Sequence, residues 1–262
     1  MYTPFITTLH YKNFPQWFVP IILFISLFLT YETIWTLWQT PIPATIILFF
    51  ISIALLLFFR SIKMCIIFIG VSLFGTLHDI YFIAHDLWHY KETTIGTIPL
   101  YLPLTWGIIS IIIIATFKTI LILLKERYHN PPSFTTALTS TLATLGIALL
   151  GMAHLSMHQP VLIALFILID VLYTLIMRSV PLMIIGIIAL SGGTLGEITS
   201  VAIGAWHYPS GTIAGIPPFI FIGWDIIGII IAGTYITLDA QDAPWRHIIS
   251  GKSSSTRANH QH

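Results

Sequence analysis

The sequence predicts an all-α protein: a polytopic membrane helix bundle of eight transmembrane helices, built as two parallel four-helix repeats. The prediction rests on the composition, on the number of long apolar segments and on a repeat at a fixed offset. Of the 262 residues, 56% are hydrophobic and 8% are charged, and the mean hydropathy is +0.90. Soluble domains carry about 25% charged residues, so this composition excludes a soluble domain.

Eight segments are long and apolar enough to cross a bilayer. The hydrocarbon core is about 30 Å thick and a helix rises about 1.5 Å per residue, so a span needs about 20 mostly apolar residues. The segments that meet this requirement are Pro15–Thr36, Pro43–Phe59, Met64–Trp88, Pro99–Leu124, Phe134–His158, Pro160–Met177, Pro181–Trp206 and Pro217–Leu238. Several of them begin near a proline, which a helix tolerates in its first turn.

The basic residues predict the orientation. If the loops alternate between two sides, every Lys and Arg except Lys91 falls on the side of the two termini. These residues are Lys12, Arg60, Lys63, Lys118, Lys125, Arg127, Arg178, Arg246, Lys252 and Arg257. Positive charge concentrates in cytoplasmic loops, so we expect both termini in the cytoplasm and a location in a bacterial inner (plasma) membrane. The net charge of +1 leaves no basic surface for nucleic acid, and the single cysteine, Cys65, excludes a disulfide within the chain.

An internal repeat aligns the two halves without a gap. The offset is 118 residues, the separation between Arg60 and Arg178. The segments that coincide include Gly75–Leu77 with Gly193–Leu195, Trp88–Tyr90 with Trp206–Tyr208, Ile98–Pro99 with Ile216–Pro217, and Trp106 with Trp224. Each repeat has an even number of spans, so both insert in one orientation about a pseudo-two-fold axis along the membrane normal. We therefore divide the chain into a first repeat (1–124), a second repeat (125–238) and a polar cytoplasmic tail (239–262).

The repeated Trp-His-Tyr triplets predict a substrate-binding surface on the outer side. The candidate residues are Trp88, His89, Tyr90, Trp206, His207 and Tyr208. Trp and Tyr are also common as anchors at membrane interfaces, and this role alone would explain the aromatic residues. It does not explain why the whole loop after each triplet is repeated, which suggests a shared re-entrant or lid-like structure.

Intramembrane acids supply the candidate catalytic residues, because ionisable groups are costly inside a bilayer. The repeat places Asp79 opposite Glu197, and each lies about 13 Å along a helix from the triplet that follows it. Two carboxyls that converge there would repel one another, so at least one would keep its proton and serve as a proton donor. The alternative is that each bonds a neighbouring helix. Asp225, one residue after Trp224, is the third candidate at this depth, although neither it nor Asp170 has an acidic counterpart in the first repeat.

Histidines gather toward the same side and provide an alternative site. Their spacing along helices would let two imidazoles reach one metal ion, so zinc or iron is the alternative cofactor. The candidates are His78, His85, His89, His154 and His158. The ligand pattern is incomplete and is not duplicated as a whole, so we predict hydrogen-bonded histidines at helix ends, no metal site and no cofactor.

The stretch GEITSVAIGAWHYPSGTIAGIPPFIFIGW, residues 196–224, combines an intramembrane acid, an aromatic-x-Tyr, Ile-Pro and Trp. It resembles the membrane carotenoid-biosynthesis proteins of the carotenoid hydratase type, which share intramembrane acids with the membrane lycopene cyclases. The acid and the aromatic-x-Tyr are closer together here than in that family. The resemblance implies acid chemistry on an isoprenoid chain, in which a carboxyl protonates a double bond before water capture or ring closure. It makes Glu197 the acid and Asp79 its counterpart.

Three classes of function follow from these observations. The first is an enzyme that acts on a lipid-soluble, isoprenoid-like substrate by carboxyl-mediated protonation. The second is a proton-coupled small-solute transporter, which the parallel repeat and the paired carboxyls would suit. The third is a metal-binding or purely structural membrane protein. The expected partner is a membrane lipid or an isoprenoid and not a nucleic acid, and the sequence leaves the oligomeric state open.

Overall fold

The computed structural model describes residues 17–124, 133–156 and 158–240, and within them eight helices are long and apolar enough to cross a membrane. They are α1 (Phe18–Leu37), α2 (Pro41–Phe59), α3 (Ile62–Ala84), α4 (Leu102–Leu123), α5 (Phe134–Leu155), α6 (Gln159–Met177), α7 (Val180–Ala202) and α8 (Pro218–Ala240). The predicted all-α membrane bundle is therefore confirmed.

Part of the predicted orientation rests on residues that the structure does not describe. These residues are Lys12, Lys125, Arg127, Arg246, Lys252 and Arg257. Most of the predicted tail and the predicted start of the first span at Pro15 also lie outside the described residues. The cytoplasmic position of the termini stays a prediction.

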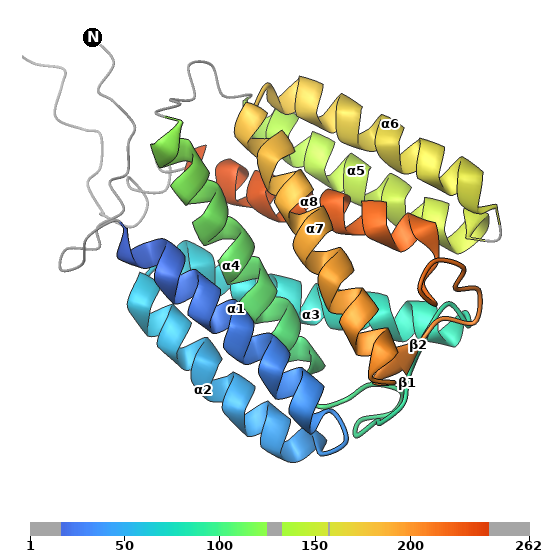
Figure 1. Ribbon diagram of the computed structural model, residues 1–262. Coiled ribbons are helices and arrows are strands. Elements are labelled where there is room, and N and C mark those ends of the chain that lie inside the picture. Colours follow the sequence, from blue (N-terminus) through green and yellow to red (C-terminus); the bar gives the residue numbers. More distant parts are fainter. Residues whose placement is uncertain (1–16, 125–132, 157, 241–262) are drawn as a thin grey trace, which may run out of the picture.

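The helices form a central group with one pair on either flank. The long hairpin-like pairs α3–α4 and α7–α8 make the centre, and α4 also contacts α7 and α8. On one flank α1 and α2 pack against α4, and on the other α5 and α6 pack against α8 (Figure 1). Equivalent helices of the two halves thus occupy equivalent places.

Backbone details recur at the offset of 118 residues. Arg60 and Arg178 adopt left-handed conformations, with φ of 45° and 50°, and end α2 and α6. The next residues, Ser61 and Ser179, cap α3 and α7 by accepting hydrogen bonds from backbone N–H groups of the first turn. A left-handed residue ends a helix and a serine at the N-cap satisfies a free N–H group, so Arg-Ser forms a compact helix-to-helix corner in both halves.

The predicted ends of the third and seventh spans are wrong, because the Trp-His-Tyr triplets are not helical. Asp86 and Gly204, which are equivalent by the repeat, take positive φ values of 62° and 78° and turn the chain out of the helix. The chain then forms β1 (His89–Tyr90) and β2 (Trp206–His207), which pair in antiparallel register. These two short strands cover one end of the bundle, called the strand end below (Figure 1).

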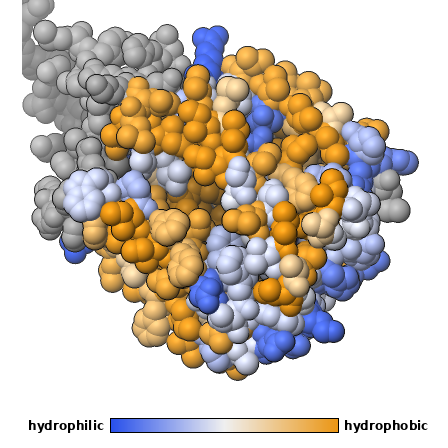
Figure 2. All heavy atoms as spheres, viewed as in Figure 1, coloured by the Kyte–Doolittle hydropathy of each residue, from blue (hydrophilic) through white to orange (hydrophobic). Residues whose placement is uncertain are grey.

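The outer surface of the bundle is apolar, as a protein surrounded by lipid requires. Large hydrophobic side chains such as Phe24, Leu57 and Leu73 are more than half exposed. Figure 2 shows hydrophobic residues over much of the face in view and hydrophilic residues gathered toward the strand end. The buried core between the helices is also apolar, and Asp79 and Glu197 are the acids buried within it.

Two glycines allow the central helices to approach closely. A Cβ atom at Gly75 of α3 would overlap the Trp106 indole of α4, and a Cβ atom at Gly193 of α7 would overlap the Trp224 indole of α8. The two contacts are equivalent by the repeat. Each glycine therefore leaves the space in which an indole lies flat on the neighbouring helix.

We expect Gly193→Ala to lower the stability of the protein by about 1–3 kcal/mol, because the added methyl group forces the Trp224 indole to move. Gly192→Ala is the matched control, since a Cβ atom there would meet open space and alanine is the better helix former. Thermal unfolding of the detergent-purified variants, followed by tryptophan fluorescence, measures the difference. Equal unfolding temperatures would contradict the close packing of Gly193 on Trp224.

Candidate functional site

A cavity of about 480 Å³ lies among the helices, with residues of α1 and of α3 to α8 in its wall. This volume is in the range of small-molecule sites. The wall is mostly made of Ile, Leu, Phe and Trp side chains. The acids and phenols in the wall gather toward the strand end, so the cavity is an apolar chamber with one polar end.

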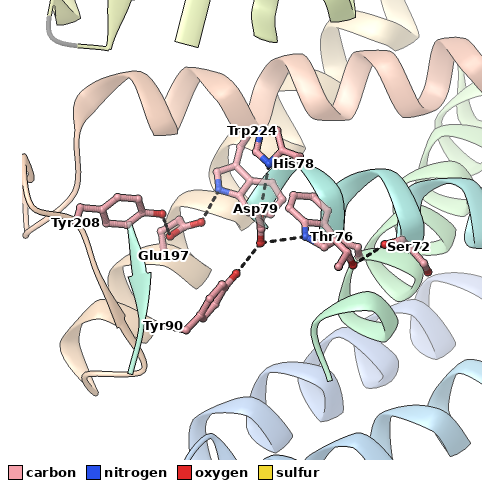
Figure 3. A network of polar contacts seen from close by, with 9 residues as sticks. Ser72, Thr76, His78, Asp79, Tyr90, Glu197, Tyr208 and Trp224 are labelled. Carbon is pink, nitrogen blue, oxygen red and sulfur yellow. Dashed lines mark hydrogen bonds and ion pairs between the residues drawn. The ribbon is translucent and has the colours of Figure 1, made fainter. Parts of the chain in front are cut away.

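Asp79 is the carboxyl that the first repeat contributes to this end. It lies on the inner face of α3 and is 3% exposed. Its Oδ2 atom accepts hydrogen bonds from the Tyr90 hydroxyl at 2.6 Å and from the Trp106 Nε1 at 3.3 Å. Its Oδ1 atom lies 3.0 Å from the Nδ1 of His78 (Figure 3). The donors come from the loop after α3 and from α4.

Glu197 is the carboxyl that the second repeat contributes. It is 8% exposed, on the inner face of α7. Its Oε2 atom accepts hydrogen bonds from the Tyr208 hydroxyl at 2.6 Å and from the Trp206 Nε1 at 2.9 Å. Its Oε1 atom accepts one from the Trp224 Nε1 at 3.2 Å (Figure 3). Tyrosine and tryptophan thus hold both acids in the same way.

The aromatic residues of the two halves interleave, so the two carboxyls share one chamber. The Trp106 and Trp224 rings are stacked, with centroids 5.7 Å apart and an interplanar angle of 22°. Tyr90 packs against Trp206 at 5.6 Å between centroids. The equivalent pair, Trp88 and Tyr208, is 6.0 Å apart. The structure therefore brings together the acids that the repeat paired.

Each carboxyl keeps one unused acceptor position. A carboxylate offers about four lone-pair positions. On Asp79, two are used on Oδ2 and one on Oδ1 by His78. On Glu197, two are used on Oε2 and one on Oε1. A ligand that donates a hydrogen bond, or a proton ready for transfer, can occupy the remaining position on Oδ1 or Oε1.

The triplets divide into residues that line the cavity and residues that do not. Trp88, Tyr90, Trp206 and Tyr208 line it, whereas His89 and His207 are absent from its wall. Successive side chains of an extended strand point to opposite sides, so the central residue of each triplet faces away. The His89 and His207 rings lie 5.3 Å apart, and the Nε2 of His89 is 2.6 Å from Oδ1 of Asp86.

Asp225 lies away from the cavity. It is adjacent to Trp224 in sequence, but it is not part of the wall. Its carboxyl lies near that of Asp170 on α6 and against Gly186 of α7. The structure does not bring the third candidate acid to Asp79 and Glu197.

The alternative prediction, a metal site formed by the histidines, is wrong. Among the described residues, no group of three His, Cys, Asp or Glu side chains could hold a metal ion. The helix ends before the stripe of histidines is complete, so His85 caps α3 and His89 belongs to β1. His85 and His154 each bond the backbone carbonyl of the preceding turn, at Tyr81 and Leu150.

Three parts of the site were not predicted as functional residues. Trp106 and Trp224 were noticed as repeated residues, and their pairing with glycines at the same offset was the signal for a close helix contact. The sequence places His78 among the histidines expected as metal ligands or at helix ends, and does not identify it as the partner of the acid that it directly precedes and bonds. Tyr31 of α1 also lines the cavity, and no sequence pattern marked it.

Comparisons with known proteins establish the fold. The sequence matches no known protein family and no curated protein. Its structure is similar to that of MvINS, a mycobacterial Insig homologue from Mycobacterium vanbaalenii, and to that of a cross-linked MvINS trimer. In both comparisons the TM-score is 0.56 and the sequence identity is 15%, over 69% of this chain and 95% of the other. The protein is therefore an integral membrane protein with an Insig-like fold. These neighbours are not carotenoid-biosynthesis proteins.

The phenols at the strand end predict how stability depends on pH. Burial raises the pKa of Tyr90 and Tyr208 well above 10, and the charges of Asp79 and Glu197 raise it further. In the unfolded chain both phenols ionise near pH 10. The folded protein keeps these protons, so its stability is full below about pH 10 and falls as the pH rises above it.

Replacing both residues by phenylalanine is expected to reduce this alkaline loss of stability. Unfolding free energies at a series of pH values, for the wild type and the Tyr90→Phe/Tyr208→Phe variant, measure the effect. The ultraviolet absorbance of phenolate gives an independent readout. Two phenolates that form near pH 10 in the folded wild type, and not in the variant, would contradict the prediction.

Proposed function

We propose that the protein is an enzyme that binds a lipid-soluble, isoprenoid-like substrate in the cavity and protonates one of its double bonds. The observation that carries the proposal is the pair of carboxyls, Asp79 and Glu197, at the polar end of an otherwise apolar chamber. Each has one acceptor position left unused by the protein. The resemblance to carotenoid hydratases and membrane lycopene cyclases supports the same chemistry.

The wall of the cavity suits a hydrocarbon substrate and a cationic intermediate. Apolar side chains surround the space in which a chain would lie. Protonation of a carbon–carbon double bond leaves a carbocation, and the faces of aromatic rings attract positive charge. Trp106 and Trp224 line the cavity, and each donates a hydrogen bond to one of the acids. A cation formed there would be next to two indoles and a carboxylate.

Histidine distinguishes the two acids. His78 lies 3.0 Å from Asp79, and imidazole exchanges protons near neutral pH. The residue equivalent to His78 in the second repeat is Gly196, so Glu197 has no such partner. We therefore assign Asp79 as the proton donor, with His78 restoring its proton. The sequence resemblance gave this role to Glu197, which here becomes the base.

The reaction balances with these two roles. Asp79 transfers its proton to one carbon of the double bond and becomes a carboxylate, and the other carbon becomes cationic. Water then adds to the cation and gives a proton to Glu197, so the net change is addition of water across the double bond. When no water is present, Glu197 removes a proton from a carbon next to the cation, and the double bond moves. If a second double bond of the chain adds to the cation first, a ring closes, the positive charge passes to a carbon of that second double bond, and Glu197 removes a proton beside it. No metal or organic cofactor enters either sequence.

Deuterium incorporation tests the proposal directly. The purified protein is incubated in heavy water with an acyclic polyene, lycopene, or with a shorter isoprenoid, geranylgeraniol. Products are expected to carry deuterium on carbon, detected by mass spectrometry. Asp79→Asn and Glu197→Gln are each expected to reduce incorporation by about 100-fold or more, because each removes a group that transfers a proton.

Glu32→Gln is the matched control, since this exposed glutamate of α1 lies within a span but not in the cavity wall. Its activity should equal that of the wild type. A product without deuterium would contradict protonation as the first step. Stoichiometric binding of both isoprenoids without any product would show a lipid-binding protein in place of an enzyme.

A further inference from the structure

The internal repeat predicts two equivalent flanks of the cavity, and the structure closes only one of them. One flank lies between α1 and α7, and the other lies between α5 and α3, because these helices are equivalent at the offset of 118 residues. Ile34 of α1 and its counterpart Met152 of α5 both line the cavity. The two flanks therefore reach the cavity at the same place in each half and can be compared residue by residue.

Tyr31 closes the flank between α1 and α7. Its hydroxyl donates a hydrogen bond of 3.1 Å to the carbonyl oxygen of Gly192. Its ring lies in the space left by Gly196, where a Cβ atom would be 2.6 Å from the tyrosine Oη. The ring is also stacked on Trp35, with centroids 5.3 Å apart. A tyrosine on one helix and two glycines on the other thus make a tight contact.

The flank between α3 and α5 has none of these parts. The counterpart of Tyr31 is Leu149, which has no hydroxyl. The counterparts of Gly192 and Gly196 are Phe74 and His78, which leave no groove for a ring. Helices α1 and α7 touch over a short stretch, and α3 and α5 touch less or not at all. The sequence differences therefore coincide with a difference in closure.

Residues on the open flank face both the cavity and the outside of the bundle. Ile66 and Phe74 of α3 line the cavity and are also 54% and 40% exposed. Gly70, one turn from each, lines the cavity, is exposed, and would offer a Cβ atom only open space. Leu145 and Leu149 line the opposite side on α5, and α8 lies between the two helices. Ile66 lies about one turn from the start of α3, whereas Gly70, Phe74, Leu145 and Leu149 lie nearer the middle of their helices, where the surroundings are hydrocarbon.

We infer that a lipid chain passes between the bilayer and the cavity through this flank, a portal formed by Ile66, Gly70, Phe74, Leu145 and Leu149. The inference rests on the proposed function in that it takes the cavity to hold a lipid. It identifies the substrate as a lipid dissolved in the bilayer, whose apolar end enters first. Gly70 and Asp79 are about 13 Å apart along α3. The reactive double bond therefore lies about that far from the part of the chain in the portal, and a longer tail stays in the bilayer.

Photolabelling tests the portal without any need for turnover. The probe is geranylgeraniol with a diazirine at its apolar end, added to the protein in lipid nanodiscs. Illumination should label residues at the polar end of the cavity, identified by mass spectrometry of peptides. Gly70→Trp fills the portal and is expected to reduce this labelling by about tenfold, a 1.4 kcal/mol effect. The matched control is Ile188→Trp, at the equivalent position on the closed flank, which should label as the wild type does.

A second variant separates blocked access from misfolding. Tyr31→Leu gives α1 the residue that α5 carries, and is expected to open the other flank. Added to Gly70→Trp, it should restore labelling. The portal would be overturned if Gly70→Trp were labelled as strongly as the wild type, or if Ile188→Trp lost as much labelling as Gly70→Trp. The two experiments fail independently of one another. Loss of deuterium incorporation in Asp79→Asn with normal labelling would leave the portal intact. Normal labelling of every variant would reject the portal, and absence of deuterium incorporation in the wild type would reject the chemistry.

Discussion

A carboxyl group inside a membrane needs hydrogen-bond donors around it, and this requirement organises the strand end. An ionised acid without partners costs several kcal/mol to bury. Asp79 obtains donors from Tyr90 and Trp106, so the loop after α3 must fold back over the cavity and α4 must pack closely on α3. Gly75 lies one helical turn from Asp79, on the same face. The indole that rests on this glycine therefore reaches the acid, and the second half repeats the arrangement with Gly193, Glu197 and Trp224.

The features that the two repeats share form the common structure of the site, and the features in which they differ make its two acids and its two flanks unequal. The helix corners, the short strands and the acid–tyrosine–tryptophan groups are common to both halves. Histidine lies beside one acid, and glycine takes its place beside the other. The same glycine, Gly196, accommodates Tyr31 and so closes one flank. The difference between His78 and Gly196 thus distinguishes the two acids chemically and, together with Tyr31 against Leu149, distinguishes the two flanks sterically.

Much of the fold could be predicted from the sequence, because span length and hydropathy depend only on local composition. The pairing of Asp79 with Glu197 could also be predicted, since the repeat relates positions at equal depth. However, the depth of a residue in the membrane does not determine the direction in which its side chain points. Neighbouring residues on a helix point about 100° apart, so Asp225 faces away from the cavity that Trp224 lines. For the same kind of reason, His89 and His207 were misplaced: the sequence showed the triplets but not the two-residue alternation of strands.

The position of the proposed portal would also limit which lipids the site could accept. A head group with several polar atoms would have to cross a mid-span opening lined by Gly70, Phe74 and Leu145, and each unbonded polar group costs about 2–7 kcal/mol in such surroundings. A hydrocarbon end crosses it at no such cost and then meets the only buried acids among the described residues, Asp79 and Glu197. The apolar opening therefore excludes head groups before the acids are reached. In the proposed function, the acids then act on unsaturation within a hydrocarbon chain, because a double bond carries no polar atom through the proposed portal.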